Sequence, residues 1–208
     1  MPNPFKLQTA NPISIPKVGV YIDGANIIHG GLESGWLIDY SKLINFVKRS
    51  FNPVIISYYD CTGYERDTNG IYLKDGNGNY LPKSGQIKFH NALMGLGIRI
   101  RTKPVKFIRG DEGKPVNKMD GDLIVDALKE EKQWDELILY GGDCDYEALV
   151  DQMISLAKKV HIFSYKTRLA HELKSKAFSS PFVVVTLGHT RERKTGVDWG
   201  LTNYQVWV

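Results

Sequence analysis

The fold of this chain is decided by VGVYIDGANI, residues 18–27, in which an apolar run ends abruptly at a carboxylate. The run predicts a buried strand over residues 17–22, because residues 18–22 carry no charge. Asp23 stands at the end of that strand. A buried carboxylate is unfavourable unless a cation or a hydrogen-bond donor meets it, so Asp23 needs a partner elsewhere in the chain.

Length and composition are those of a globular protein. The 208 residues fit one large domain, with or without an appendage, and 42% of them are apolar and 24% charged. No segment reaches the roughly 18 apolar residues of a membrane helix, and residues 1–16 are expected to form a polar, Pro-rich arm rather than a signal peptide. Two cysteines make no disulfide framework, so we expect a cytoplasmic protein without a membrane partner. The net charge of +4 suits a polyanion partner without requiring one.

Strand-like and helix-like segments alternate along the chain. Strands are predicted at 17–22, 53–60, 98–108, 135–142, 160–165 and 182–187, and helices at 39–50, 84–97, 120–133, 146–159 and 167–177. This alternation predicts an α/β fold with three layers, α/β/α, around a mostly parallel central sheet.

Two segments interrupt the alternation. Residues 63–82 are rich in Gly, Asn and Asp around short Tyr-containing runs, which predicts a protruding hairpin insertion. Residues 109–117 form a second excursion, and residues 188–208 form a C-terminal extension with a basic cluster and an aromatic end. No internal repeat is expected. The predicted domain therefore covers residues 17–187, between the N-terminal arm and the extension.

Carboxylates follow the strands at the edge where function is expected. Ligands of an open parallel α/β sheet bind beyond the carboxyl ends of its strands. Asp23 follows the first strand, and Asp143 and Asp145, in GGDCDYEAL, follow a later one. A helix that joins two parallel strands begins at the same edge, and Asp120 begins such a helix. Helical geometry turns Asp120 toward the buried face, so these side chains are expected to meet.

Asp122 and Asp126 lie four residues apart on the flanking face of the same helix, so four or five carboxylates converge on one edge. Like charges this close raise one another's pKa unless a cation neutralises them. A hard divalent ion with oxygen ligands, Mg²⁺ or Mn²⁺, is the expected partner of Asp23. Simpler roles stay open: a helix N-cap for Asp120, turn contacts for Asp143 and Asp145, and solvated side chains for Asp122 and Asp126.

Three sequence blocks resemble the NYN domain, the LabA-like branch of the PIN-like nucleases: VYIDGANI, KMDGDLIVDAL and LILYGGDCDYEALV. The weaker VHIFSYKTRLAHELKSKA continues the pattern. The resemblance implies a PIN-like fold and metal-dependent hydrolysis of RNA. By position it implies that Asp23, Asp120 and Asp143 are catalytic and bind the metal ion. It also implies that Asp145 supports them in catalysis and that Asn26 stands beside the site.

Two positions depart from the family pattern. Gly142 stands where the family commonly has Ser, and Cys144 stands where it has Gly. Both changes are expected to affect rate or substrate choice, because neither removes a carboxylate. Asp126 also matches a recurrent Asp of the family. Either Asp145 or Asp126 is a candidate to orient a water or a second ion. His29 is expected to be a solvated loop residue.

Basic residues precede the helix that begins at Asp120, where they would position phosphates beside the acidic site. The candidates for nucleic-acid binding are Arg99, Arg101, Lys103, Lys106, Arg109 and Lys118. The expected partner is single-stranded RNA, and homo-oligomer formation stays open. Tyrosines of the 63–82 insertion either stack on unpaired bases or pack the insertion onto the domain.

Three other functions compete with a ribonuclease. A non-catalytic RNA-binding or scaffold module would keep the same fold, and the changes at Gly142 and Cys144 favour it mildly. A phosphatase with an aspartyl nucleophile requires a second Asp two residues after the first, where this chain has Ala25. A dinucleotide-binding enzyme requires a glycine fingerprint that DGANIIHGG does not supply.

Overall fold

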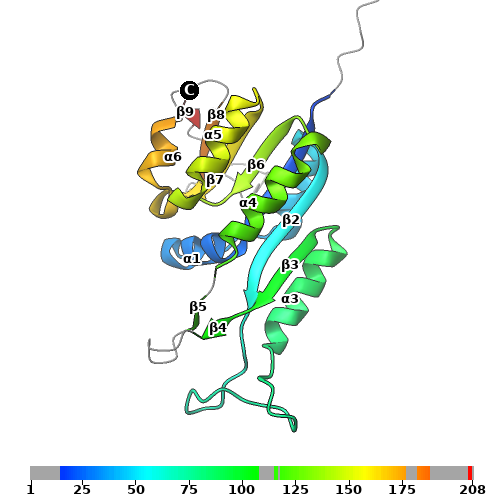
Figure 1. The fold of residues 1–208 in the computed structure, drawn as a ribbon, viewed down its shortest axis with the longest axis vertical. Helices are drawn as coiled ribbons and strands as arrows, with labels where there is room; N and C mark the ends of the chain where they lie inside the picture. The colour runs from blue at the N-terminus through cyan, green and yellow to red at the C-terminus, as the bar shows by residue number, and fades with distance from the viewer. Residues whose placement is uncertain (1–14, 108–114, 117, 177–181, 188–205, 208) are drawn as a thin grey trace, which may run out of the picture.

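A computed structural model describes residues 15–107, 115–116, 118–176, 182–187 and 206–207. Within these residues the main sheet has seven strands in the order β3-β2-β1-β6-β7-β8-β9, and neighbouring strands run parallel except β8 and β9 (Figure 1). The strands are β1 (Lys17–Asp23), β2 (Asn52–Thr62), β3 (Arg99–Pro104), β6 (Glu136–Tyr140), β7 (Lys159–Tyr165), β8 (Phe182–Leu187) and β9 (Val206–Trp207). A small second sheet pairs β4 (Lys106–Phe107) with β5 (Pro115–Val116). The predicted, mostly parallel sheet is confirmed.

The sheet changes its direction of growth between β1 and β6. The chain places β2 and β3 on one side of β1, and then β6, β7 and β8 on the other side. Ligands of open α/β sheets bind at such a switch point, beyond the carboxyl ends of the strands. β1 ends at Asp23, and the loop after β6 carries Asp143. The topology therefore brings together the two segments that the sequence singled out.

Helices cover both faces of the sheet, which confirms the three-layer architecture. The helices are α1 (Gly24–Ser34), α2 (Tyr40–Ser50), α3 (Ser84–Gly95), α4 (Asp120–Glu130), α5 (Glu147–Ser155) and α6 (His171–Lys176). One core cluster joins the sheet to α1, α2 and α3 and includes Ile27 and Val47. The opposite cluster joins it to α4, α5 and α6 and includes Leu123 and Met153. In Figure 1, α4 and α5 lie over the sheet on the viewer's side.

The helix α1 differs from the sequence prediction, which treats the segment after Asp23 as a loop. GANIIHGGLES contains three glycines, each unfavourable in a helix by roughly 1 kcal/mol relative to Ala. Close packing requires all three. A Cβ on Gly24 would overlap the ring of Tyr58. A Cβ on Gly30 would overlap the ring of Tyr165, and one on Gly31 would come within 2.7 Å of a backbone carbonyl oxygen. His29 therefore lies on an exposed face of a helix that packs tightly against the sheet.

The insertion after β2 contains a repeat, contrary to the sequence expectation. RDTNGIYL (66–73) is followed directly by KDGNGNYL (74–81). In each copy the Asp carboxylate accepts the backbone N–H groups two and four residues later, at 2.8–2.9 Å. The Gly that closes each turn has a φ of 82° or 85°, a conformation that favours glycine. The insertion is thus two similar turns in sequence.

The two turns are closed against each other around three tyrosines. Tyr64, Tyr72 and Tyr80 lie eight residues apart, and their ring centroids are 5.1–6.2 Å from one another. Backbone hydrogen bonds of 2.8–3.0 Å form a closed ring through Glu65, Leu73 and Leu81. The three rings therefore pack against one another within the insertion, and the Tyr64 hydroxyl also donates to the carbonyl oxygen of Val105 at 3.4 Å.

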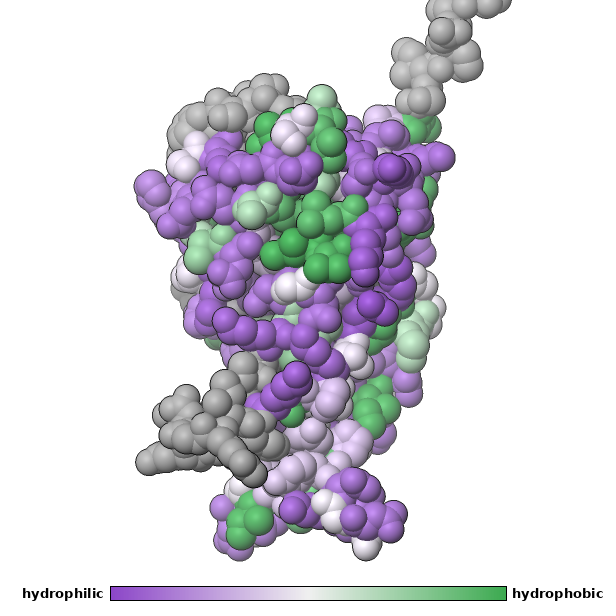
Figure 2. All heavy atoms as spheres, in the orientation of Figure 1, coloured by the Kyte–Doolittle hydropathy of each residue, from purple (hydrophilic) through white to green (hydrophobic). Residues whose placement is uncertain are grey.

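The ends of several elements differ from the prediction. The strand expected at 98–108 is divided between β3 and β4, and the helix expected at 167–177 begins with a 3-10 turn before α6. Residues 206–207 of the predicted extension add β9 to the sheet, whereas Arg109 and most of the N-terminal arm lie outside the described residues. None of the described helices is long and apolar enough to cross a membrane. The face over α4 and α5 is mostly hydrophilic around one apolar patch (Figure 2).

Candidate metal centre

Asp23 links the end of β1 to the beginning of α1. Its Oδ1 accepts the backbone N–H of Asn26 at 3.0 Å, so the carboxylate caps the helix. The side chain is deeply buried, and the residue is only 6% exposed. A Cβ on Gly141 would lie 3.3 Å from the Asp23 Cβ, which brings the loop after β6 directly against this carboxylate. The side-chain oxygen of Asn26 is buried and has no hydrogen-bond partner within the described part of the chain.

Tyr146 joins Asp23 to Asp120. Its hydroxyl lies 2.8 Å from Asp23 Oδ2 and 3.1 Å from Asp120 Oδ1. One hydroxyl has a single proton to donate, so it cannot donate to both carboxylates at once. The predicted inward direction of Asp120 is consistent with this contact. The two carboxylates therefore share a donor that suffices for only one of them.

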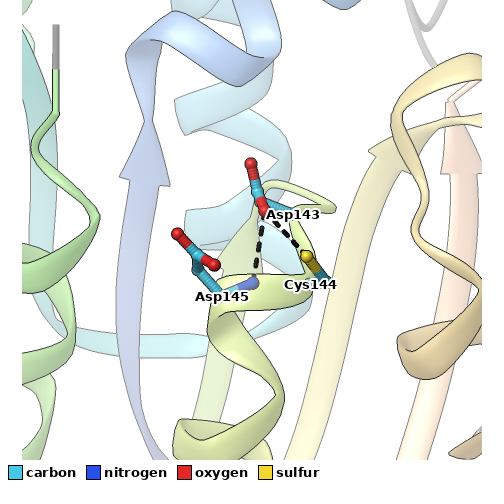
Figure 3. A group of neighbouring side chains, drawn as sticks. All are labelled: Asp143, Cys144 and Asp145. Carbon is cyan, nitrogen blue, oxygen red and sulfur yellow. Dashed lines mark hydrogen bonds between the residues drawn. The ribbon is translucent and has the colours of Figure 1, made fainter. Parts of the chain in front are cut away.

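Asp143 and Asp145 lie on the 3-10 turn that follows β6 (Figure 3). The ligand atoms of Asp143, Cys144 and Asp145 are within 4.8 Å of one another, and all three residues are exposed. Asp143 Oδ1 accepts the backbone N–H of Asp145 at 3.2 Å and lies 3.4 Å from Cys144 Sγ. Asp143 therefore also makes the turn contact that the sequence left open as its simpler role. Asp23 and Asp120 are outside this group of three. In the acidic centre Asp23 is thus buried, Asp120 is half-buried, and Asp143 and Asp145 lie closer to the solvent.

The carboxylates of the centre influence one another electrostatically. Burial, together with the charges of Asp120 and Asp143, raises the pKa of Asp23 from 3.8 to about 6. Hydrogen bonds from Asn26 and Tyr146 oppose this rise. Burial and the charges of Asp143 and Asp145 also raise the pKa of Asp120. Burial is the larger cause of both shifts, and the neighbouring carboxylates add to it.

The donor set suits a hard divalent cation. All four Asp side chains offer carboxylate oxygens, and the unpartnered oxygen of Asn26 adds a neutral one. Histidine, the usual nitrogen ligand of zinc, does not occur among these residues. Among the described residues, only Asp143, Cys144 and Asp145 form a group of three whose ligand atoms all lie within 4.8 Å of one another. Asp23 and Asp120 would therefore have to approach Asp143 to share an ion with it.

Gly142 is explained by packing. A Cβ at this position would overlap the hydroxyl oxygen of Ser164 and the backbone carbonyl of Arg168. The carbonyl oxygen of Gly142 also accepts the backbone N–H of Ala170 at 2.8 Å. A side chain here would push the loop after β6 away from β7, so the absence of a hydroxyl at residue 142 follows from the local fold.

Asp122 and Asp126 are directed toward β3 rather than toward Asp23. Alternate residues of a strand are about 6.6–6.8 Å apart, close to the roughly 6 Å between residues four apart on a helix. Cations of β3 therefore match acids of α4 one to one. The ion pairs are Arg99 with Glu130, Arg101 with Asp126, and Lys103 with Asp122. The Tyr59 hydroxyl also donates to Asp126 Oδ2 at 3.0 Å.

These ion pairs change what the basic residues offer to a polyanion. Arg99, Arg101 and Lys103 each have a carboxylate partner within the fold, so their charge is largely balanced. Lys106 and Lys118 are exposed. Phosphate binding by these basic residues stays a prediction. A phosphate can displace a carboxylate partner at the surface, because surface ion pairs are worth only about 0–1 kcal/mol.

Tyr146 was not predicted from the sequence as part of the site. The signal is its position three residues after Asp143 in a turn that leads into a helix, since residues three apart in a 3-10 turn lie on the same side. Its burial is complete, and burial strongly raises its pKa, so it acts as a neutral hydrogen-bond donor.

Comparisons with known proteins identify the family and the fold. The model of the NYN domain family matches residues 17–182. The low amplitude and bright protein LabA of Synechococcus elongatus is 24% identical over 163 residues, which cover 76% of this chain and 79% of LabA. A crystal structure of a protein of unknown function from Vibrio parahaemolyticus aligns with a TM-score of 0.62 at 19% identity. The alignment covers 84% of this chain and 96% of that one, and it supports the fold.

The fold and the acidic edge define a nuclease-like α/β protein. The chain belongs to the NYN domain family. Members of this family generally act on RNA and use divalent metal ions, and the carboxylates described above supply the matching acidic cluster.

Proposed function

We propose that this protein is a metal-dependent ribonuclease that hydrolyses phosphodiester bonds of single-stranded RNA. The observation that carries the proposal is the burial of Asp23 beside Asp120 at the switch point, with Asp143 close enough to raise its pKa. A buried carboxylate beside a second, half-buried one is unfavourable for stability and is expected where a cation is bound.

The residues of the centre have different roles. Asp23, Asp120 and Asp143 hold Mg²⁺ or Mn²⁺, which when bound supplies positive charge to the phosphate and makes water a better nucleophile. Tyr146 keeps Asp23 and Asp120 oriented through its hydroxyl. Asp145 is exposed on the same turn as Asp143, where it can accept a proton from the attacking water. Asn26 lines the buried side of the centre.

Cleavage of a fluorescent single-stranded RNA by the full chain tests this function. With Mn²⁺ we expect cleavage by the wild type and a loss of about 100-fold or more in Asp23→Asn and Asp143→Asn, since each removes a metal ligand. Asp151→Asn is the matched control, because Asp151 is an exposed acid of α5 that pairs with Lys176. Chelation by EDTA should abolish cleavage and added Mn²⁺ should restore it.

The same experiment separates the alternative. A folded wild type that binds RNA but cleaves none with either metal ion would be a non-catalytic RNA-binding or scaffold module. Equal cleavage by the wild type and Asp23→Asn would contradict the proposed role of the acidic centre.

A further inference from the structure

A pocket of about 450 Å³ lies beside the acidic centre and is not part of it. Its walls come from α1, the end of β2, the 63–82 insertion, α3 and the segment after β3. The volume falls within the range of about 300–1,000 Å³ that is typical of small-molecule and cofactor sites. The insertion thus closes one side of a space next to the carboxyl edge of the sheet.

The pocket lies next to the metal centre. Asp23 is paired in register with Tyr59 of β2, and Asp60 and Cys61, the next two residues, line the pocket. Neighbouring strands are about 4.8 Å apart, so the pocket is one strand away from Asp23. On α1, Ala25 lines the pocket two residues after Asp23. A strand of RNA whose phosphate lies at the metal centre would therefore place the next nucleotide in the pocket.

The lining combines cations with aromatic surface. Arg66 and Lys83 lie on the wall formed by the insertion and the beginning of α3, and His29 adds an exposed imidazole from α1. Tyr64 and Phe89 provide apolar surface on the same walls. Cations bind phosphate, and aromatic side chains bind unpaired bases by stacking.

The floor of the pocket is held rigidly. Gln86 Nε2 donates to Asp60 Oδ2 at 2.6 Å and to the carbonyl oxygen of Cys61 at 2.8 Å, and Gln86 Oε1 accepts the backbone N–H of Gly63. His90 Nε2 lies 3.2 Å from the same Asp60 oxygen. Asp60 is therefore occupied by partners within the fold. The Arg66 guanidinium lies over the ring of Tyr72, 4.1 Å from its centroid, and has no acidic partner among the ion pairs of the described residues, so it and Lys83 keep positive charge on the wall of the pocket.

We infer that this pocket binds the nucleotide adjacent to the scissile phosphate of a single-stranded RNA, an inference that rests on the proposed ribonuclease function. The base lies against the aromatic walls, and its phosphate contacts Lys83 and Arg66. The insertion is then a substrate-binding element that fixes where along the strand the acidic centre cuts.

Binding of a short, fluorescein-labelled single-stranded RNA to the full chain carrying Asp23→Asn tests the inference without cleavage. In this background Lys83→Gln should raise the Kd by about three- to tenfold. The slope of the logarithm of the association constant against the logarithm of the salt concentration should fall in magnitude by about 0.7. Lys88→Gln is the matched control, since Lys88 is an exposed lysine of α3 that does not line the pocket. It should change neither quantity.

A second pair of variants tests the space itself. Gly63 lines the pocket, and a Cβ there has its nearest neighbour at an ordinary 3.4 Å. Gly63→Leu should weaken binding by roughly 5- to 150-fold if it excludes a stacked base, whereas Gly76→Leu, at an open position of the insertion outside the pocket, should not. Thermal unfolding confirms that each variant is folded.

The outcomes distinguish this inference from the proposed function. Equal effects of Lys83→Gln and Lys88→Gln, with RNA still cleaved in the Asp23 wild-type background, would overturn the pocket assignment alone. A wild type that neither binds nor cleaves RNA would overturn both. If Gly63→Leu fails to fold, the lysine pair still decides the matter.

Discussion

Replacing Asp23 with Asn should stabilise the protein when divalent ions are absent. The carboxyl of Asp23 has a pKa of about 6 in the folded protein, against 3.8 ordinarily. Ionising it therefore disfavours the folded state. The penalty is absent below about pH 4, develops as the pH rises toward 6 and is complete above that value. A difference of about 2 pH units corresponds to about 3 kcal/mol at neutral pH.

The amide keeps part of the hydrogen bonding of the carboxylate. Its oxygen can still accept the N–H of Asn26, and the Tyr146 hydroxyl can donate to Asp120 without competition. Allowing about 1 kcal/mol for changes in hydrogen bonding, Asp23→Asn should raise the free energy of unfolding by about 1–3 kcal/mol at pH 7.5. The gain should vanish near pH 4.

Urea unfolding in EDTA at several pH values between 4 and 7.5 measures this effect. Asp126→Asn is the comparison variant, and it should destabilise the protein because Asp126 bonds to Arg101 and Tyr59. Added Mn²⁺ at a concentration of about 1,000 Kd should reverse the ranking, because the wild type then gains about 4.1 kcal/mol and the variant gains little. A destabilising Asp23→Asn in EDTA at pH 7.5, or an effect independent of pH, would refute the reasoning.

Three further substitutions test the packing around the centre. Gly142→Ala should destabilise by about 1–3 kcal/mol in urea unfolding because its Cβ overlaps β7 and a backbone carbonyl, whereas Gly121→Ala, which meets nothing within 4 Å, should be neutral or slightly stabilising. Glu130→Ala should cost about 1–3 kcal/mol of unfolding free energy, because the buried hydroxyl of Tyr21 loses its acceptor, and leave RNA cleavage unchanged. Tyr146→Phe should move the acid limb of the pH–rate profile to higher pH. In the wild type the Tyr146 hydroxyl lowers the pKa of Asp23 and of Asp120, so its removal raises both pKa values. An acid limb that does not move would contradict this.

The sheet and the positions of its acidic residues follow from patterns within single segments. The apolar run before Asp23 and the β/α alternation are local signals, and the rule that ligands bind at carboxyl ends converts them into a place in space. Asp23 and Asp120 accordingly contact the same Tyr146 hydroxyl, and the charge of Asp143 raises the pKa of both. The burial of Asp23 and the partial exposure of the other carboxylates depend on the turn that carries Tyr146, which no periodic pattern specifies.

The features that the sequence did not predict depend on contacts between segments. The helix α1 is rich in glycine because Tyr165 and Trp36 pack against its backbone, and a local propensity argument counts those glycines against a helix. The pairing of β3 cations with α4 acids requires two elements to be aligned, so the basic residues seemed free for phosphate when taken alone. The repeat in the insertion was visible in the spacing of its tyrosines but is short and imperfect.

The central claim is that Asp23, Asp120 and Asp143 together hold a divalent ion. Anomalous diffraction from crystals of the protein soaked in Mn²⁺ tests it most directly. We predict a peak within about 2.0–2.6 Å of carboxylate oxygens from both Asp23 and Asp143, the range for hard divalent ions. A map with no peak there, or with manganese bound only by the exposed Asp143 and Asp145, would contradict the account.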